Sequence, residues 1–143
     1  MKLFFDNNLP PTLAKALDAL ITPHHAVHLR DKFPTDTLDI AWIDILKQEG
    51  NWVIISQDQF KENTSERKAL ADSGLVVYLL VGKQWNKLPL LDKNLAVLEW
   101  TKAILAHAEP VLAEACKTGK GSAWSIKYAA NNRKHVFIRE HLN

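Results

Sequence analysis

The sequence has 143 residues, of which 47% are hydrophobic and 24% charged, and its formal net charge is +2. This length fits one globular domain with a buried core. The composition excludes a membrane-spanning protein, because no apolar run approaches the roughly 20 residues that a spanning helix needs. The first residues lack the basic and apolar regions of a signal peptide, and Cys116 is the only cysteine. We therefore expect a cytoplasmic protein without disulfides.

Four short apolar runs bounded by turn residues predict strands. These strands are Lys2–Phe5, 26–29, Trp52–Ser56 and 75–81. Between them, apolar residues recur at helical spacing and predict three helices. These helices are 9–20, 38–49 and a third that starts at 63 or 64 and runs to 73. Asp36 or Thr37 is expected to cap the second helix, and Gly50 and Gly74 to end the second and the third.

The second half of the chain predicts a long helix and a hairpin. Pro89 opens a helix over residues 90–107, and a separate short helix is expected after Pro110. Apolar residues then alternate over 122–128 and 134–138 on either side of two asparagines, which indicates a hairpin. Because strands and helices alternate in the first half, we predict one α/β domain with a mostly parallel sheet.

Charge is distributed unevenly along this chain. Residues 117–143 carry six basic residues and one acid, which gives a net charge of +5 there and −3 over residues 1–116. We divide the chain accordingly into a main body, 1–116, and a basic C-terminal hairpin extension of the same domain, 117–143. The extension can bind a polyanion or an acidic protein, or it can be a solvated polar hairpin. Its basic residues are Lys117, Lys120, Lys127, Arg133, Lys134 and Arg139.

Three carboxylates are expected at one edge of the sheet. In an open parallel sheet, ligands bind beyond the carboxyl ends of the strands. Asp6 and Asp58 follow two predicted strands there, and Asp39 lies in the first turn of the helix between them. Acids that converge repel one another unless a cation lies between them, and oxygen-only ligation favours Mg²⁺ or Mn²⁺ over zinc. The sequence therefore predicts a magnesium or manganese site formed by Asp6, Asp39 and Asp58.

Each acid also has a structural alternative. Asp6 can form a turn or a helix cap, Asp58 can cap the turn after its strand, and Asp39 can be a first-turn helix acid. Neighbouring polar residues can support the acids by hydrogen bonding or can serve turns and a capping box instead. These supporting candidates are Asn8, Ser56 and Glu66.

Histidines 24, 25 and 28 form a cluster that invites a zinc interpretation. No cysteine lies nearby, and strand alternation places His25 on the opposite face from His24 and His28. The pattern therefore does not favour a zinc site.

Several separated segments resemble the PIN-like nucleases of VapC-type toxins, in the compact branch with Ile-Ser-x-Asp and Glu-Arg-x-Ala-Leu motifs. The resemblance covers roughly residues 1–105. Its motifs are Asp6-Asn7-Asn8-Leu9-Pro10, Asp39-Ile40, Trp52-Val53-Ile54-Ile55-Ser56-Gln57-Asp58, Glu66-Arg67-Lys68-Ala69-Leu70 and Ser73-Gly74-Leu75. It implies a three-layer α/β/α PIN-like fold and metal ligation by Asp6, Asp39 and Asp58. Related chains place Glu directly after the first Asp, where this chain has Asn7, so the number of metal ions stays open.

The resemblance also implies a toxin ribonuclease that a protein antitoxin neutralises. We expect hydrolysis of RNA phosphodiesters by a water activated by Mg²⁺ or Mn²⁺. A catalytically silent RNA- or protein-binding module is the alternative, and a phosphohydrolase of small phosphoesters is a third reading. A homodimer is compatible with the sequence. The candidates for binding the RNA backbone are Arg30, Lys32, Lys61, Arg67, Lys127, Arg133 and Lys134.

Overall fold

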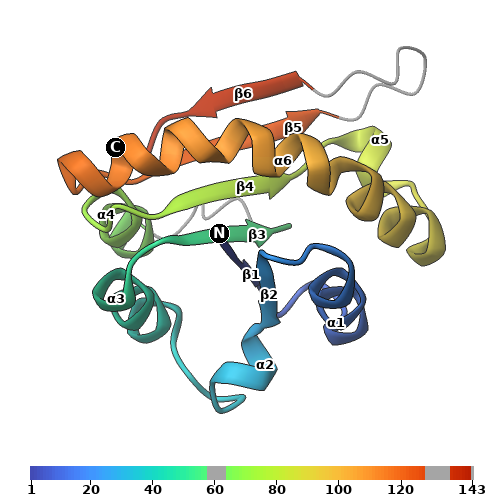
Figure 1. The fold of residues 1–143 in the computed structure, drawn as a ribbon, viewed down its shortest axis with the longest axis horizontal. Helices are drawn as coiled ribbons and strands as arrows, with labels where there is room; N and C mark the ends of the chain where they lie inside the picture. The colour runs from blue at the N-terminus through green and yellow to red at the C-terminus, as the bar shows by residue number, and fades with distance from the viewer. Residues whose placement is uncertain (58–63, 128–135, 143) are drawn as a thin grey trace.

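The computed structural model describes residues 1–57, 64–127 and 136–142. Its centre is a six-stranded sheet of order β2-β1-β3-β4-β5-β6 (Figure 1). Neighbouring strands are parallel from β2 to β5, and β6 is antiparallel to β5. This confirms the predicted α/β fold with a mostly parallel sheet and a C-terminal hairpin. The strands are β1 (Lys2–Phe5), β2 (His25–His28), β3 (Trp52–Ser56), β4 (Val76–Leu80), β5 (Ser122–Lys127) and β6 (Val136–Glu140).

Helices cover both faces of the sheet and complete three layers (Figure 1). One apolar core cluster joins the sheet to α1, α5 and α6, and a second joins its other face to α2, α3 and α4. Alternate residues of β1 enter different clusters, because side chains alternate along a strand. The helices are α1 (Pro11–Leu20), α2 (Leu29–Lys32), α3 (Asp39–Glu49), α4 (Thr64–Ala71), α5 (Lys83–Asn86) and α6 (Leu90–Thr118).

Strands β3 and β4 are buried along their whole length, as expected of central parallel strands. The three tryptophans predicted to be core residues, Trp42, Trp52 and Trp100, are at most 7% exposed. Gly50 ends α3 with a φ of 76°, a left-handed conformation that glycine adopts without steric cost. None of the described helices is long and apolar enough to cross a lipid bilayer.

Three predicted helix boundaries were wrong. Helix α1 begins at Pro11 rather than at residue 9, because Pro10 is extended, as a residue before proline prefers to be. Helix α3 has Leu38 at its N-cap position with no side-chain cap, so neither Asp36 nor Thr37 caps it. Helix α6 runs unbroken through Pro110, where two separate helices were expected.

The sheet order brings three strand ends together. Strand β1 lies between β2 and β3, and Phe5 pairs with His28 on one side and with Ile55 on the other. Residues that follow these positions therefore meet at one edge, which we call the carboxyl edge.

Candidate active site at the carboxyl edge

Asp6 is a buried acid directly after β1. Its residue is 6% exposed, and its backbone N–H extends the ladder by donating to the Ile55 carbonyl at 3.0 Å. Its Oδ1 accepts the Asn7 N–H at 2.6 Å, and its Oδ2 accepts the hydroxyl of Ser56 at 2.8 Å. Ser56 is the last residue of β3 and is fully buried. The ends of two neighbouring strands therefore fix the orientation of the Asp6 carboxylate.

Asn8 and Gln57 form further hydrogen bonds between the same two strand ends. Gln57 donates its backbone N–H to Asn8 Oδ1 at 3.1 Å and its Nε2–H to the Asn8 carbonyl at 2.7 Å. The indole N–H of Trp85 in α5 donates to Gln57 Oε1 at 2.8 Å. Asn8 Nδ2 also lies 3.5 Å from Ser56 Oγ, at the long limit of a hydrogen bond. The structure thus brings the two candidates Ser56 and Asn8 to this edge, Ser56 in contact with Asp6 and Asn8 in contact with Ser56, while Gln57 was not foreseen.

His28 anchors the loop after β1 from the other side. The side chain is fully buried at the end of β2. Its Nε2 lies 2.6 Å from the Leu9 carbonyl, and the Arg30 N–H donates to its Nδ1 at 3.0 Å. Because Nδ1 accepts, the proton must be on Nε2, which donates to Leu9. The sequence predicted a strand over 26–29, which contains His28, but it gave no signal for this role.

Asp39 begins α3, which covers the same face of the sheet that Asp6 faces. Side chains alternate along a strand, so Asp6 shares the face of Phe4. The centroid of the Phe4 ring lies 5.0 Å from that of the Trp42 ring in α3, and Trp42 donates its indole N–H to Asp39 Oδ1 at 2.9 Å. Asp39 is thus held one helical turn from a residue that packs on β1.

The direction of α3 sets how far Asp39 lies from the strand ends. Glu49, the last residue of α3, accepts the indole N–H of Trp52 at 2.9 Å, and Trp52 is the first residue of β3. Asp39 lies ten residues earlier, about 15 Å along the helix. Because α3 ends beside the amino end of β3, its first residue Asp39 lies displaced toward the carboxyl edge.

The third predicted acid, Asp58, lies outside the described residues, as do Lys61, Arg133 and Lys134. Within residues 1–57, 64–127 and 136–142, no three His, Cys, Asp or Glu side chains lie together as a potential metal site. The proposed set of three acids includes Asp58 and therefore extends beyond this part of the chain.

The basic candidates take different positions. Arg30 is exposed at the carboxyl edge and donates its Nε–H to Asn7 Oδ1 at 2.7 Å. Lys127 is exposed at the end of β5, on the same edge. Arg67 of α4 instead donates to the His141 carbonyl. Glu66, a supporting candidate, is half-buried in the first turn of α4.

Lys32 faces the amino end of the sheet instead. Its Nζ lies 3.0 Å from Glu49 Oε2 and 5.3 Å from the centroid of the Trp52 ring. The hydrogen bond from Lys32 lowers the pKa of Glu49 below its usual value. The structure therefore places Lys32 in a salt bridge between α2 and α3, away from Asp6.

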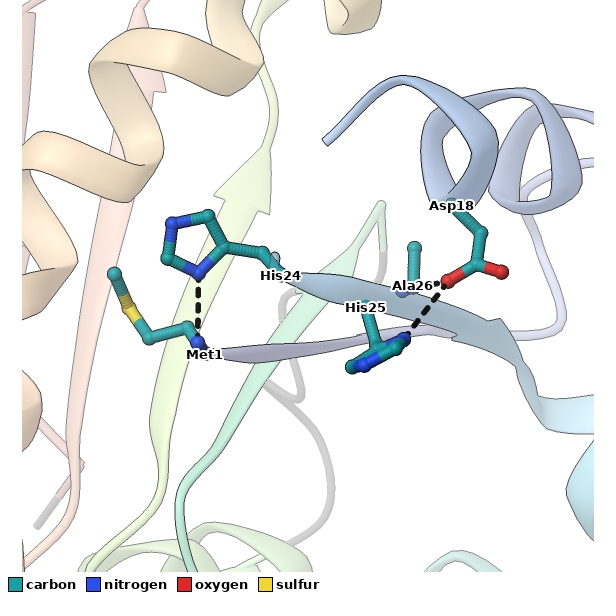
Figure 2. A network of polar contacts seen from close by, with 5 residues as sticks. All are labelled: Met1, Asp18, His24, His25 and Ala26. Carbon is teal, nitrogen blue, oxygen red and sulfur yellow. Dashed lines mark hydrogen bonds and ion pairs between the residues drawn. The ribbon is translucent and has the colours of Figure 1, made fainter. Parts of the chain in front are cut away.

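Histidines 24 and 25 lie at the amino edge and engage separate partners (Figure 2). The Met1 amine lies 2.7 Å from His24 Nδ1, and His25 Nδ1 lies 3.6 Å from Asp18 Oδ1. The Asp18 carboxylate also accepts the Ala26 N–H at 2.9 Å. His24 and His25 therefore contact two different groups, the Met1 amine and the Asp18 carboxylate.

A separate aromatic cluster lies between α6 and the C-terminal strands. Tyr78 Oη lies 2.6 Å from His107 Nδ1, and the His107 ring stacks on Phe137 at 4.2 Å. Burial raises the pKa of Tyr78 and lowers that of His107. Both shifts favour the neutral forms, in which the Tyr78 hydroxyl donates to the imidazole.

The chemistry of the edge fits a hard cation. The polar atoms around Asp6 come from a carboxylate, a hydroxyl and amides, so the available ligands are oxygens rather than thiolates. A carboxylate has about four lone-pair sites, so a carboxylate oxygen can accept hydrogen bonds and ligate a metal ion at the same time. Oxygen donors of this kind suit Mg²⁺ and Mn²⁺.

Comparison with known families gives one match. A family model described as a PIN like domain matches residues 1–82, more than half of the chain. No curated protein and no solved structure matches the chain. The matched region runs from β1 through β4 and includes positions 6, 39 and 58, whereas α6, β5 and β6 lie outside it.

Proposed function

The chain belongs to the PIN-like domain family, whose members are generally nucleases, and from this premise we propose that it is a metal-dependent endoribonuclease. The observation that carries the proposal is Asp6, an acid that is 6% exposed and oriented by Ser56 at the carboxyl ends of two adjacent strands. Such an edge is where open parallel sheets bind their ligands. Asp6 is buried and held in one orientation by the Asn7 N–H and the Ser56 hydroxyl, which fits a carboxylate positioned to bind a metal ion.

In this proposal Asp6, Asp39 and Asp58 hold Mg²⁺ or Mn²⁺. When bound, the metal supplies an activated water at neutral pH and neutralises negative charge on the phosphoryl oxygens. Ser56 and Asn8 keep Asp6 in one orientation, and Trp42 does the same for Asp39 through its indole N–H. No covalent enzyme intermediate is needed.

Basic residues at the same edge would position the RNA backbone. Arg30 is exposed beside Asn7, and Lys127 is exposed at the end of β5. Phosphate contacts of this type fix the register of a nucleic acid without reading its sequence. Lys32 and Arg67 are engaged with Glu49 and His141 and make weaker candidates.

We propose further that the enzyme is the toxin of a toxin–antitoxin system with a protein antitoxin. This finer assignment is supported by the sequence motifs, among them Ile-Ser-x-Asp over residues 55–58 and Glu-Arg-x-Ala-Leu over residues 66–70. The basic segment 117–143 is a candidate contact surface for an acidic partner or for RNA.

Metal binding by Asp39 tests the proposed ligand set. Asp39→Asn keeps an oxygen that can accept the Trp42 N–H, so the fold should be retained. We expect Mn²⁺ affinity measured by calorimetry to fall at least tenfold, because a charged ligand is lost. Asp44→Asn is the matched control, since Asp44 is an exposed acid of the same helix. Equal affinities for the two variants would remove Asp39 from the site.

The catalytically silent binding module is a second candidate. It is supported by Asn7, which stands where related chains have Glu and whose Oδ1 is bound by Arg30. Activity separates the candidates, because a silent module binds RNA but leaves it intact with Mn²⁺ present. Activity on small phosphoesters but not on RNA would instead indicate the third hypothesis, a phosphohydrolase.

A further inference from the structure

A groove of about 370 Å³ lies at the carboxyl edge, where its lining begins at Asn7, the residue after Asp6. Its walls come from the loop after β1, from α2, from the residue after β3 and from the first turns of α6. Helices α1 and α6 flank this edge of the sheet (Figure 1). The polar side chains that line it are Asn7, Asn8, Arg30, Gln57, Lys93 and Asn94.

The charge of the groove has one sign. Arg30 and Lys93 bring two cations from separate elements, and no Asp or Glu is among the described lining residues. The remaining polar groups are amides, which can donate to phosphate oxygens and to base edges. An anion with hydrogen-bonding groups is therefore the ligand that this lining favours.

Both cations are held in place by neighbouring groups. Asn7 Oδ1 accepts the Arg30 Nε–H at 2.7 Å, which uses one donor of a guanidinium that has five. Lys93 Nζ lies 5.8 Å from the centroid of the Trp85 ring, and Trp85 is itself fixed by its bond to Gln57. The groove is thus connected by hydrogen bonds to the strand ends that orient Asp6.

We infer that this groove binds the backbone of single-stranded RNA beside the phosphate that is cut, with Arg30 and Lys93 as positioning residues. The inference rests on the proposed function and extends it, because Lys93 and Asn94 lie outside residues 1–82 that match the family. The volume is at the lower end of the range for ligand sites, which suits one nucleotide unit rather than a duplex. Apolar surface from Pro10 and Leu90 lines the same groove and can contact a sugar or base.

The test measures RNA binding without cleavage. A fluorescein-labelled single-stranded RNA of about 12 nucleotides is titrated with protein in EDTA, and anisotropy gives the Kd at several salt concentrations. Lys93→Gln should weaken binding three- to tenfold and lower the slope of log K against log salt by about 0.7, the value for one phosphate contact on a single strand. Lys102→Gln is the matched control, because Lys102 is an exposed lysine of the same helix outside the groove.

Several outcomes would overturn the inference. It fails if Lys93→Gln and Lys102→Gln bind alike, if the wild-type protein does not bind the RNA at low salt, or if the annealed duplex binds as tightly as the single strand. Thermal melts of both variants establish that they are folded. Arg30→Gln, a variant of the cation in α2, is titrated with the same RNA and should also bind it more weakly. If RNA binding depends on Lys93 but the protein does not cleave RNA with Mn²⁺, the groove is supported and the nuclease function is refuted. If the protein cleaves RNA but Lys93→Gln binds RNA as tightly as wild type, the nuclease function is supported and the groove is refuted.

Discussion

Replacing Ser56 with Ala removes the hydroxyl that donates to Asp6 Oδ2 at 2.8 Å. Ser56 is fully buried and Asp6 is 6% exposed, so water has little access to replace the lost donor. A hydrogen bond to a charged group contributes about 1.5–3 kcal/mol, against about 0.5–1.5 kcal/mol for a neutral pair. We expect Ser56→Ala to lower the free energy of unfolding by about 1.5–3 kcal/mol at pH 7, because a hydrogen bond to a charged carboxylate is lost.

A double-mutant cycle isolates the contribution of the charge. In an Asp6→Asn background the partner of Ser56 is a neutral amide, so Ser56→Ala should cost only about 0.5–1.5 kcal/mol. The coupling between the two positions should therefore be about 1 kcal/mol, measured by urea unfolding of all four proteins. Thr101→Val is the control, because its buried hydroxyl donates to the neutral Val97 carbonyl at 2.7 Å. It should cost less than about 1 kcal/mol, within the range for a neutral hydrogen bond.

The same substitution has a functional consequence. Replacing a residue that orients a metal ligand typically lowers metal affinity or activity 10–100-fold. Ser56→Ala should therefore weaken Mn²⁺ binding as well as stability, whereas Thr101→Val should leave Mn²⁺ binding unchanged. The reasoning is refuted if Ser56→Ala costs under about 0.5 kcal/mol, below the range for a neutral hydrogen bond, or costs the same in both backgrounds.

Three further predictions concern stability. His28→Ala should cost about 2–5 kcal/mol in urea unfolding, because it leaves the Leu9 carbonyl and the Arg30 N–H without their partner. Burial lowers the pKa of His107 in the folded state, so the unfolded state binds more protons at this residue. The stability that His107 contributes should therefore be complete above about pH 6.5 and be lost as the pH falls through the folded-state pKa. Urea midpoints of His107→Gln should accordingly vary less with pH over that window. Glu49→Gln should cost less than about 1 kcal/mol by the same measurement, since its salt bridge is partly exposed.

Each of these outcomes can contradict its premise. A His28→Ala protein as stable as wild type would mean that the loop after β1 is anchored elsewhere. Parallel pH profiles for wild type and His107→Gln would remove the imidazole as the cause. A large effect of Glu49→Gln would show that the bridge is less solvated than its geometry indicates.

Local sequence patterns were sufficient to predict most strands. Residues 52–56 were predicted with the bounds that the structure has, because a run that is apolar on both faces has few alternatives to a central parallel strand. The predicted ends of the first and third strands then placed Asp6, Asn8 and Ser56 at one edge. These features depend on neighbours in the sequence and on a general property of parallel sheets.

Helix α6 depends on its surroundings. Pro110 has no N–H for the Ala106 carbonyl, which normally ends a helix. Both residues are exposed, so water can satisfy that carbonyl, while Ala108 and Leu112 remain buried and keep the helix on the sheet. A pattern of residues alone does not reveal that the proline faces solvent.

Tertiary contacts decide the remaining roles at the site. His28 and Gln57 act on loops that reach them only after folding, and no local spacing predicts their partners Leu9 and Asn8. Lys32 has the charge of an RNA-binding residue, but the path of α2 brings it to Glu49. Charge by itself therefore does not show which basic residues lie at the carboxyl edge.

RNA cleavage by Asp6→Asn tests the central claim most directly. Asparagine keeps an Oδ1 that can accept the Asn7 N–H and an amide that can bond Ser56, so the turn and the fold should survive. We predict that the wild-type protein cleaves single-stranded RNA with Mg²⁺ or Mn²⁺, that EDTA stops cleavage, and that Asp6→Asn lowers the rate at least a hundredfold, roughly the effect of losing a metal ligand. Its melting temperature in EDTA should equal or exceed that of wild type, because one buried negative charge is removed. Cleavage by Asp6→Asn at the wild-type rate would contradict the assignment of this edge as a metal-dependent nuclease site.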